Sequence, residues 1–142
     1  MKFWDSSALV PIVSRELQSP KCQRLLRQDP GVLVWVLTRV EVQSALARKR
    51  RGGEISRTDL RDARKRLGKV AAGWNEVLVA ERLLGRAIHL LDVHDLRAAD
   101  ALQLAAAWTA SGEDPSRLHF VTLDERLLLA AEREGFPVIE PR

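Results

Sequence analysis

Residues 32–36 have the sequence Val-Leu-Val-Trp-Val, an apolar run that follows the turn Asp29-Pro-Gly31. A strand that is apolar at every position is typical of a parallel sheet covered on both faces. The rest of the chain agrees, because short strand-like runs alternate with helical stretches. The expected strands are 2–4, 32–36, 77–79, 118–121 and 138–139, and the expected helices are 7–13, 20–28, 38–51, 56–70, 81–93, 96–111 and 124–134. We therefore predict an α/β fold with a central parallel sheet.

The length and composition fit one globular domain spanning residues 1–142. The chain is 46% hydrophobic and 30% charged, the balance of an ordinary protein with a real core. No apolar run approaches the roughly 20 residues that cross a bilayer, and the start of the chain lacks the layout of a signal peptide. Cys22 is the only cysteine, which excludes an internal disulfide and a cysteine-ligated zinc site. We expect a cytoplasmic protein that does not bind membranes.

Positive charge is concentrated between positions 48 and 69. Ten basic residues in this segment are set against Glu54, Asp59 and Asp62, so its net charge is +7 and the remainder of a +4 chain carries −3. A basic projection on an acidic body suits a partner rich in phosphates. The alternative is a solvated helix pair whose charges only keep the protein soluble. The pattern predicts contact with a phosphate backbone and says nothing about base sequence.

Asp5, Glu41 and Asp124 each come shortly after a run that we expect to be a strand. The carboxyl ends of parallel strands meet at one edge of a sheet, which is where functional sites of this fold class lie. We therefore expect these three carboxylates to be neighbours.

A fourth acid, Asp100, interrupts the apolar helical stretch Leu96-Arg-Ala-Ala-Asp-Ala-Leu-Gln-Leu-Ala-Ala-Ala-Trp108. A helix this apolar is expected to be buried on most sides, and a buried carboxylate is costly unless it is paired or binds a cation. If this helix packs at the same edge, Asp100 completes a cluster of four carboxylates. Such a cluster requires raised pKa values or a cation, and ligands that are all oxygen favour Mg²⁺ or Mn²⁺.

Each acid also has a purely structural alternative. Thr38-Arg-Val-Glu41 and Thr122-Leu-Asp-Glu125 both have the spacing of a helix capping box. Asp5 could cap the first helix, and Asp100 could form an ion pair with Arg97 three residues earlier. Taken one at a time, these alternatives are as good as the functional interpretation. They do not explain why all four acids should share one edge of the sheet.

Four motifs in this order resemble those of PIN-domain ribonucleases, and most of all the VapC-type toxins of bacterial and archaeal toxin–antitoxin modules. They are Asp5-Ser-Ser-Ala-Leu-Val10, Glu41, Leu96-Arg-Ala-Ala-Asp-Ala-Leu-Gln-Leu-Ala105 and Thr122-Leu-Asp-Glu-Arg-Leu127. The resemblance implies a three-layer α/β/α domain with a central parallel sheet and the basic helix pair as a projection. It also implies a metal-dependent endoribonuclease with Mg²⁺ or Mn²⁺ as cofactor, RNA as substrate, a cognate antitoxin as partner, and a homodimer.

The resemblance further assigns roles to individual residues. Catalysis and metal binding fall to four acids: Asp5, Glu41, Asp100 and Asp124. The hydroxyls of Ser7 and Thr122 would steady these carboxylates, and Gln103 stands where many relatives have His. Apart from the resemblance, the charge pattern predicts contacts with the RNA backbone from seven basic residues: Arg48, Lys49, Arg50, Arg51, Arg64, Lys65 and Arg97.

Two other functions remain open. The same carboxylate chemistry could cleave DNA, or process RNA outside a toxin–antitoxin module, because a metal-activated water attacks either phosphodiester backbone. A non-catalytic protein that binds RNA or a partner chain could also retain this fold. Cleavage of RNA compared with matched DNA separates the first from a ribonuclease toxin. Replacement of Asp100 without unfolding tests the second.

Overall fold

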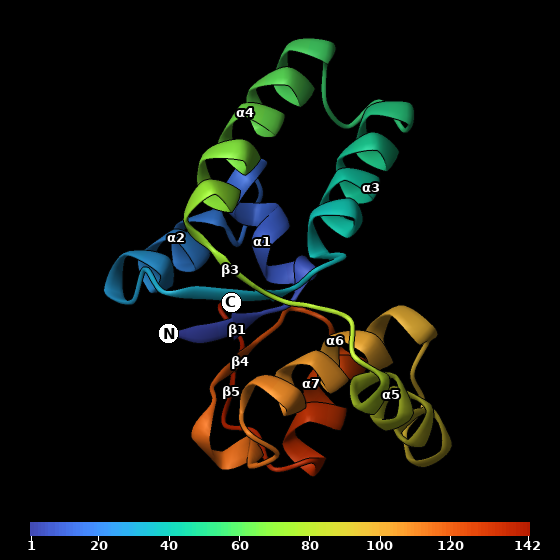
Figure 1. Cartoon of the computed structure of the whole chain (residues 1–142). Coiled ribbons are helices and arrows are strands. Elements are labelled where there is room, and N and C mark those ends of the chain that lie inside the picture. Colours follow the sequence, from blue (N-terminus) through green and yellow to red (C-terminus); the bar gives the residue numbers. More distant parts are fainter.

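A computed structural model describes residues 1–142 and arranges them as a sheet between two layers of helices (Figure 1). The strands are β1 (Lys2–Trp4), β2 (Val32–Trp35), β3 (Asn75–Val77), β4 (Phe120–Val121) and β5 (Val138–Ile139). The helices are α1 (Ser6–Val13), α2 (Ser19–Gln28), α3 (Thr38–Arg51), α4 (Arg57–Gly73), α5 (Glu81–Val93), α6 (Ala98–Ala110) and α7 (Glu125–Arg133). The predicted three-layer α/β/α fold is confirmed.

The sheet is parallel throughout, in the order β3-β2-β1-β4-β5. β1 is central, because Phe3 lies opposite Leu33 of β2 on one side and Phe120 of β4 on the other. Parallel strands in this order end at one edge. The segments that follow β1, β2 and β4 are therefore neighbours at that edge.

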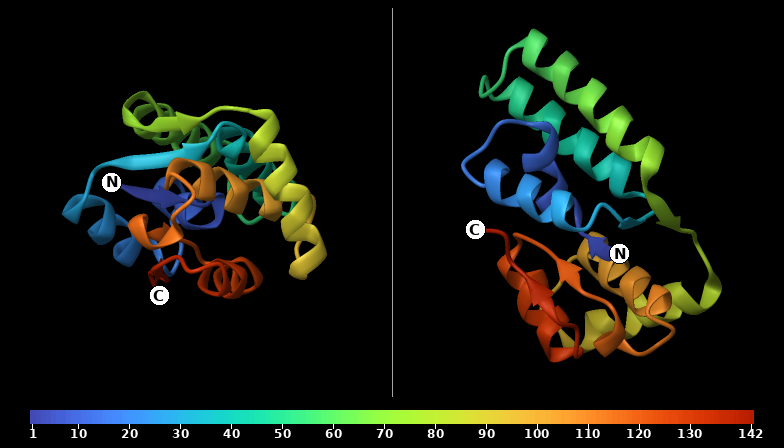
Figure 2. Two further views of the ribbon diagram at one scale, coloured as in Figure 1. Left: turned by 60° about the horizontal axis from the view of Figure 1, so that its bottom comes forward. Right: turned by 90° about the vertical axis from the view of Figure 1, so that its left-hand side faces the viewer.

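The two faces of the sheet carry separate cores. Successive strand residues point to opposite faces, so Phe3 belongs to the core that includes α5, α6 and α7, whereas Trp4 belongs to the core that includes α1, α3 and α4. Both side chains are completely buried. Figure 2 shows the two helical layers on opposite sides of the sheet. This double burial explains why β2 is apolar at every position.

Two of the boundaries that differ from the sequence-based expectation have a clear physical cause. β3 spans Asn75–Val77 rather than 77–79, because it pairs with β2, whose last residue Trp35 lies opposite Val77. Beyond that point the chain has no partner strand, and Leu78 and Val79 are 65% and 60% exposed. The α6 helix begins at Ala98 rather than at position 96, since the backbone of Arg97 is still extended.

The α3 and α4 helices run side by side and project from the sheet as a hairpin (Figure 1). Ser56 and Asp59 form a reciprocal capping box that starts α4, with hydrogen bonds of 3.0 and 2.9 Å. The predicted basic helix pair is therefore present, and its second helix continues to Gly73, three residues further than expected. No helix combines the length and the apolar character that crossing a bilayer would require.

Candidate active site

The four acids lie at or near the starts of four helices. Asp5 is the N-cap of α1 and Asp124 is the N-cap of α7. Glu41 and Asp100 lie in the first turns of α3 and α6. The amino end of a helix carries a partial positive charge, so each carboxylate has a favourable local partner. The predicted neighbourhood at the carboxyl edge is thus built from helix starts as well as strand ends.

Asp5 is buried, with 3% of its surface exposed, and is held by several donors. Its Oδ2 atom accepts the backbone N–H of Ser7 at 3.2 Å, the hydroxyl of Ser7, and the hydroxyl of Thr122 at 3.0 Å. The hydroxyl of Ser6 lies 3.4 Å from Oδ1. A carboxylate with this many donors has a fixed orientation.

The hydroxyls of Ser7 and Thr122 are themselves oriented by the backbone that leads into α7. The N–H of Leu123 donates to Ser7 Oγ at 2.9 Å, and the N–H of Asp124 donates to Thr122 Oγ1 at 3.1 Å. Each hydroxyl therefore accepts a hydrogen bond from a backbone N–H and donates one to Asp5. This arrangement links the end of β4 rigidly to the start of α1.

Glu41 is held by side chains from two other helices. Gln103 of α6 donates through Nε2 to both carboxylate oxygens of Glu41 at 3.2 Å, and to Thr38 Oγ1 at 3.1 Å. The hydroxyl of Ser6 donates to Oε2 of Glu41 at 3.0 Å. Because Ser6 also lies near Asp5, it connects the two carboxylates.

Asp100 is partly buried and has fewer donors than the other two. The backbone N–H of Arg97 lies 3.4 Å from its Oδ2 atom. The side chains of Arg97 and Arg126 are close enough to lower the pKa of Asp100, but neither forms an ion pair with it. One carboxylate oxygen therefore has no hydrogen-bond donor from the protein.

Three of the four acids, Asp5, Glu41 and Asp100, have raised pKa values. Burial is the largest cause of the raised pKa of Asp5, Glu41 and Asp100. The charge of Asp124 further raises the pKa of Asp5 and of Asp100. The charges of Asp5 and Asp100 raise that of Glu41. Hydroxyl and amide donors only partly offset these effects, so the cluster holds unfavourable negative charge that a cation would relieve.

The structural alternatives have mixed outcomes. Thr38 is the first helical residue of α3 rather than its cap, and it accepts from Gln103, so the first capping box is wrong. In the second motif Asp124, not Thr122, caps the helix, accepting the N–H of Leu127 at 2.9 Å. The predicted cap at Asp5 is present and coexists with its place in the cluster. The ion pair between Arg97 and Asp100 is absent.

The donor set fits a hard divalent cation in one particular way. All the candidate ligands are carboxylate oxygens, which Mg²⁺ and Mn²⁺ prefer. No three His, Cys, Asp or Glu side chains are arranged closely enough to surround one ion. Mg²⁺ in proteins is commonly bound by one or two carboxylates together with water and substrate phosphate. The spacing suits that mode and does not suit a shell made by all four acids around one ion.

A groove of about 680 Å³ leads from the acids toward the basic hairpin. Ser6, Ser7 and Glu41 line one end, and Arg48 and Lys49 line the other. Apolar side chains of α1, α3 and α6 form much of the wall between them. An extended ligand in this groove would therefore touch Glu41, the one acid of the cluster that lines it, and the start of the basic segment at once.

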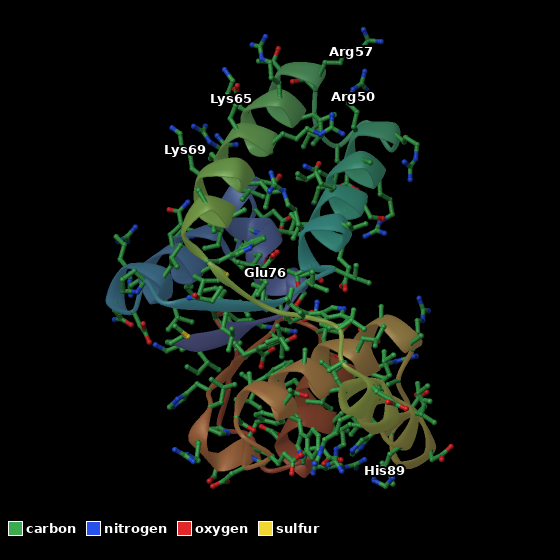
Figure 3. All side chains as sticks on the ribbon, viewed as in Figure 1. Arg50, Arg57, Lys65, Lys69, Glu76 and His89 are labelled. Atoms are coloured by element: carbon green, nitrogen blue, oxygen red, sulfur yellow. The ribbon has the colours of Figure 1, made fainter.

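The seven predicted phosphate contacts are not equivalent. Lys49 forms ion pairs with Glu16 at 2.7 Å and Glu54 at 3.3 Å. These carboxylates neutralise its charge and make it a poor contact for phosphate. Arg64 donates through Nε to Gln43 at 3.1 Å, which ties α4 to α3. The remaining five form no ion pair: Arg48, Arg50, Arg51, Lys65 and Arg97. Figure 3 shows Arg50 near the tip of the hairpin, and Lys65 on the side of α4 that faces away from α3.

The contacts that three residues make in the site were not predicted from the sequence. Ser6 and Gln103 hold Glu41, and Arg126 lies close enough to affect Asp100. Ser6 could have been found from its place beside Asp5 at a helix start. Gln103 stands three residues after Asp100 on an otherwise apolar face, and a polar side chain buried there requires a polar partner.

A parallel α/β/α sandwich with four carboxylates at the carboxyl edge of its sheet matches one class of fold and site, the PIN domain. The family model described as PIN domain matches residues 2–133 of this chain. The chain therefore belongs to the PIN-domain family.

Curated relatives match over nearly the whole length. Ribonuclease VapC46 of Mycobacterium tuberculosis is 36% identical over 139 residues, which cover 98% of this chain and 96% of the relative. Ribonuclease VapC49 of the same species is 30% identical over 133 residues, with 94% and 90% covered.

Two solved structures have the same fold. One is a toxin–antitoxin complex from Klebsiella pneumoniae, with a TM-score of 0.68 at 18% identity, covering 100% of this chain and 98% of the other. The other is M. tuberculosis VapC20, described as a toxin that cleaves the sarcin–ricin loop, with a TM-score of 0.68 at 18% identity and 96% of both chains covered. At these identities the two structures support the fold alone.

Proposed function

We propose that the chain is a metal-dependent endoribonuclease and the toxin of a type II toxin–antitoxin system. The observation that carries the proposal is the set of four carboxylates at the carboxyl edge of the sheet, three of which have raised pKa values, beside a groove that leads to the unpaired Arg48. The names of the curated relatives, which are ribonucleases of the VapC group, support RNA as the substrate.

Asp5 and Asp100 are the main candidates to hold Mg²⁺ or Mn²⁺, with Asp124 contributing directly or through water. When bound, such an ion neutralises the phosphate and lowers the pKa of a water molecule. Asp5 is oriented for this role by Ser7 and Thr122. Asp100 keeps a carboxylate oxygen without a protein donor, which leaves it available.

Glu41 is the candidate to orient the attacking water and accept its proton. Its raised pKa makes it a better base than an exposed glutamate. Gln103 and Ser6 hold its carboxylate in place. Attack by water on phosphorus with departure of the 3′ oxygen leaves a 5′-phosphate and a 3′-hydroxyl. The RNA backbone would follow the groove toward Arg48, with Arg97 beside the scissile phosphate.

The proposal also concerns partners and location. A cognate antitoxin would block the acidic groove, in keeping with the toxin–antitoxin complex among the structural neighbours. We further propose a homodimer and a cytoplasmic location, where RNA is the accessible substrate. A PIN-type nuclease acting on DNA is the second candidate, because the carboxylate chemistry does not distinguish the two backbones.

The test is to incubate the purified, antitoxin-free chain with total cellular RNA and with matched DNA, in Mg²⁺ or Mn²⁺ and in EDTA. The proposal expects RNA to be cleaved only with metal, leaving 5′-phosphate and 3′-hydroxyl ends. A 2′,3′-cyclic phosphate formed without metal would contradict the assigned chemistry. Cleavage of DNA in preference to RNA would favour the second candidate.

A further inference from the structure

A second basic surface lies on the far side of α1 from the acidic groove. We propose that α2 and the second half of α4 bind the phosphate backbone of RNA at a distance from the cleaved bond. The proposal rests on the assignment of RNA as the substrate. It narrows that substrate to RNAs long enough, or folded in such a way, to reach both surfaces.

The charge on these two helices has one sign. The α2 helix contains three basic residues and no acid, and residues 64–73 of α4 contain four basic residues and no acid. The seven are Lys21, Arg24, Arg27, Arg64, Lys65, Arg66 and Lys69. None of them forms an ion pair within the protein, in contrast to Lys49 of α3. Arg64 is hydrogen-bonded to Gln43 of α3, and Arg66 also borders a hollow that contains Asp59 and Asp62. The positive charges most available to phosphates are therefore those of the other five residues.

The basic side chains line a trough between α2 and α4. A hollow of about 290 Å³ is lined by Ile12 of α1 and by Arg27, Arg66 and Lys69. It adjoins a hollow of about 200 Å³ that shares Ile12 and Arg66 and adds Arg15. No acid lines either hollow. The trough is shallow, and its basic side chains stand beside the apolar residues Ile12, Leu26 and Val70, so a phosphate chain could contact the charges while the sugars lie against the apolar surface.

The same basic surface continues across α2 and has a defined end. On the other side of α2, Lys21 and Arg24 line a hollow of about 220 Å³, again without an acid. Toward the tip of the hairpin, Arg15 and Arg66 also line the next hollow, together with Glu54, Asp59 and Asp62, so the uniformly basic surface ends at Arg66. A surface that only keeps a protein in solution usually mixes acidic and basic side chains. A region without acids beside a region with them is better explained by binding to phosphates.

Arg66 is already oriented at the centre of the trough. Its Nε atom donates to the backbone carbonyl of Val13 at 2.7 Å, and no protein acceptor is bonded to its two terminal nitrogens. The Arg66 side chain lines both hollows. Fixing an arginine before binding lowers the entropy lost when it contacts a phosphate.

The trough and the acidic groove lie on different sides of α1. Ser6, Ser7 and Val10 of α1 line the acidic groove, whereas Ile12 lines the trough. Figure 3 shows Lys65 and Lys69 on the side of α4 away from α3, and α3 borders the acidic groove. An RNA in both sites must therefore pass around the layer formed by α1 and α4. A short oligonucleotide in the acidic groove would not reach the trough.

The test compares the double variant R27E/K69E with a control, R117E/R133E, that changes the net charge equally. All four arginine and lysine side chains are exposed and form no ion pair, so both variants should fold. The control residues lie on the side of the sheet that carries α7. Binding of end-labelled bulk transfer RNA and of a short oligoribonucleotide is measured in EDTA, over a series of salt concentrations.

We expect R27E/K69E to bind transfer RNA at least tenfold more weakly than the control does. The slope of log affinity against log salt concentration should fall by about 1.5, because each lost phosphate contact removes roughly 0.7–0.9. Binding of the short oligoribonucleotide should be unchanged. Equal affinity and slope in both variants, or an equal loss of affinity in the control, would overturn the proposal. Binding is measured without metal and therefore does not depend on cleavage. A wild-type chain that fails to cleave RNA would refute the proposed activity but would leave the comparison of RNA binding between the two variants valid.

Discussion

Gln103 of α6 donates its side-chain amide to both carboxylate oxygens of Glu41 in α3, at 3.2 Å from each. The same nitrogen lies 3.1 Å from the hydroxyl of Thr38, so one buried amide joins two helices at the acidic edge. Gln103 is completely buried, and its Oε1 atom has no partner. Only the amide nitrogen of Gln103 therefore takes part in hydrogen bonding at this site.

Replacing Gln103 with Leu keeps the volume and removes this donor. We expect the free energy of unfolding to fall by about 1–2 kcal/mol, because Thr38 and Glu41 lose a buried partner. The pKa of Glu41 should rise further, since the bond from Gln103 lowers it. Denaturant unfolding and a carboxyl NMR titration measure the two effects. Unchanged stability together with an unchanged pKa of Glu41 would show that the bond has no role.

Thr122→Val removes the hydroxyl that connects Asp124 to Asp5 without changing the shape of the side chain. We expect a loss of about 1–2 kcal/mol in the free energy of unfolding, because a buried carboxylate loses a donor and a backbone N–H loses its acceptor. Thr122→Ser keeps the hydroxyl and serves as the control. A Val variant as stable as the Ser variant would contradict the role of this bond.

Asp100→Asn should stabilise the folded chain near neutral pH. The pKa of Asp100 is raised by burial and then by the charge of Asp124, so its ionised form opposes folding. This penalty is absent below the unfolded pKa near 4 and complete above the raised folded value. After allowance for solvent screening we expect roughly 1 kcal/mol, or about 2–4 °C in Tm, at pH 7. The difference should vanish near pH 3. A lower Tm for the variant at pH 7 would mean that the carboxylate supports the fold.

Lys49→Met separates a structural role from a role in RNA binding. Lys49 joins α3 to Glu16, in the segment between α1 and α2, and its pKa is raised chiefly by the hydrogen bond to Glu16. The stabilisation is therefore complete at neutral pH and is lost only as strongly alkaline pH removes the proton. We expect a loss of about 1 kcal/mol in the free energy of unfolding and little change in RNA affinity. Arg48→Met, at an unpaired position in the groove, should show the opposite pattern.

The fold could be predicted from sequence because its determinants are local. Apolar strands such as residues 32–36 signal a sheet covered on both faces, and a parallel sheet brings its strand ends to one edge. The start of β3 could not be predicted in the same way. Val77–Val79 is the apolar run, but the strand stops where β2 ends, and this register is a tertiary property.

The site was predicted in part for the same reason. The neighbourhood of Asp5 and Glu41 follows from strand order, whereas the contact between Glu41 and Gln103 joins residues 62 positions apart. Local spacing at Thr38 suggested a capping box instead, and packing against α6 decided otherwise. The ion pair between Lys49 and Glu16 depends on how the segment after α1 folds back, which local patterns do not encode.

The most direct measurement is cleavage of total cellular RNA by the purified chain and by its folded Asp100→Asn variant, with Mg²⁺ or Mn²⁺ and with EDTA. The Tm measured for the variant shows first that it is folded. We predict discrete cleavage by the wild type that requires metal, and a loss of at least about 100-fold in the variant. Equal cleavage by both proteins, or cleavage that persists in EDTA, would contradict the claim that the four carboxylates form a metal-dependent ribonuclease site.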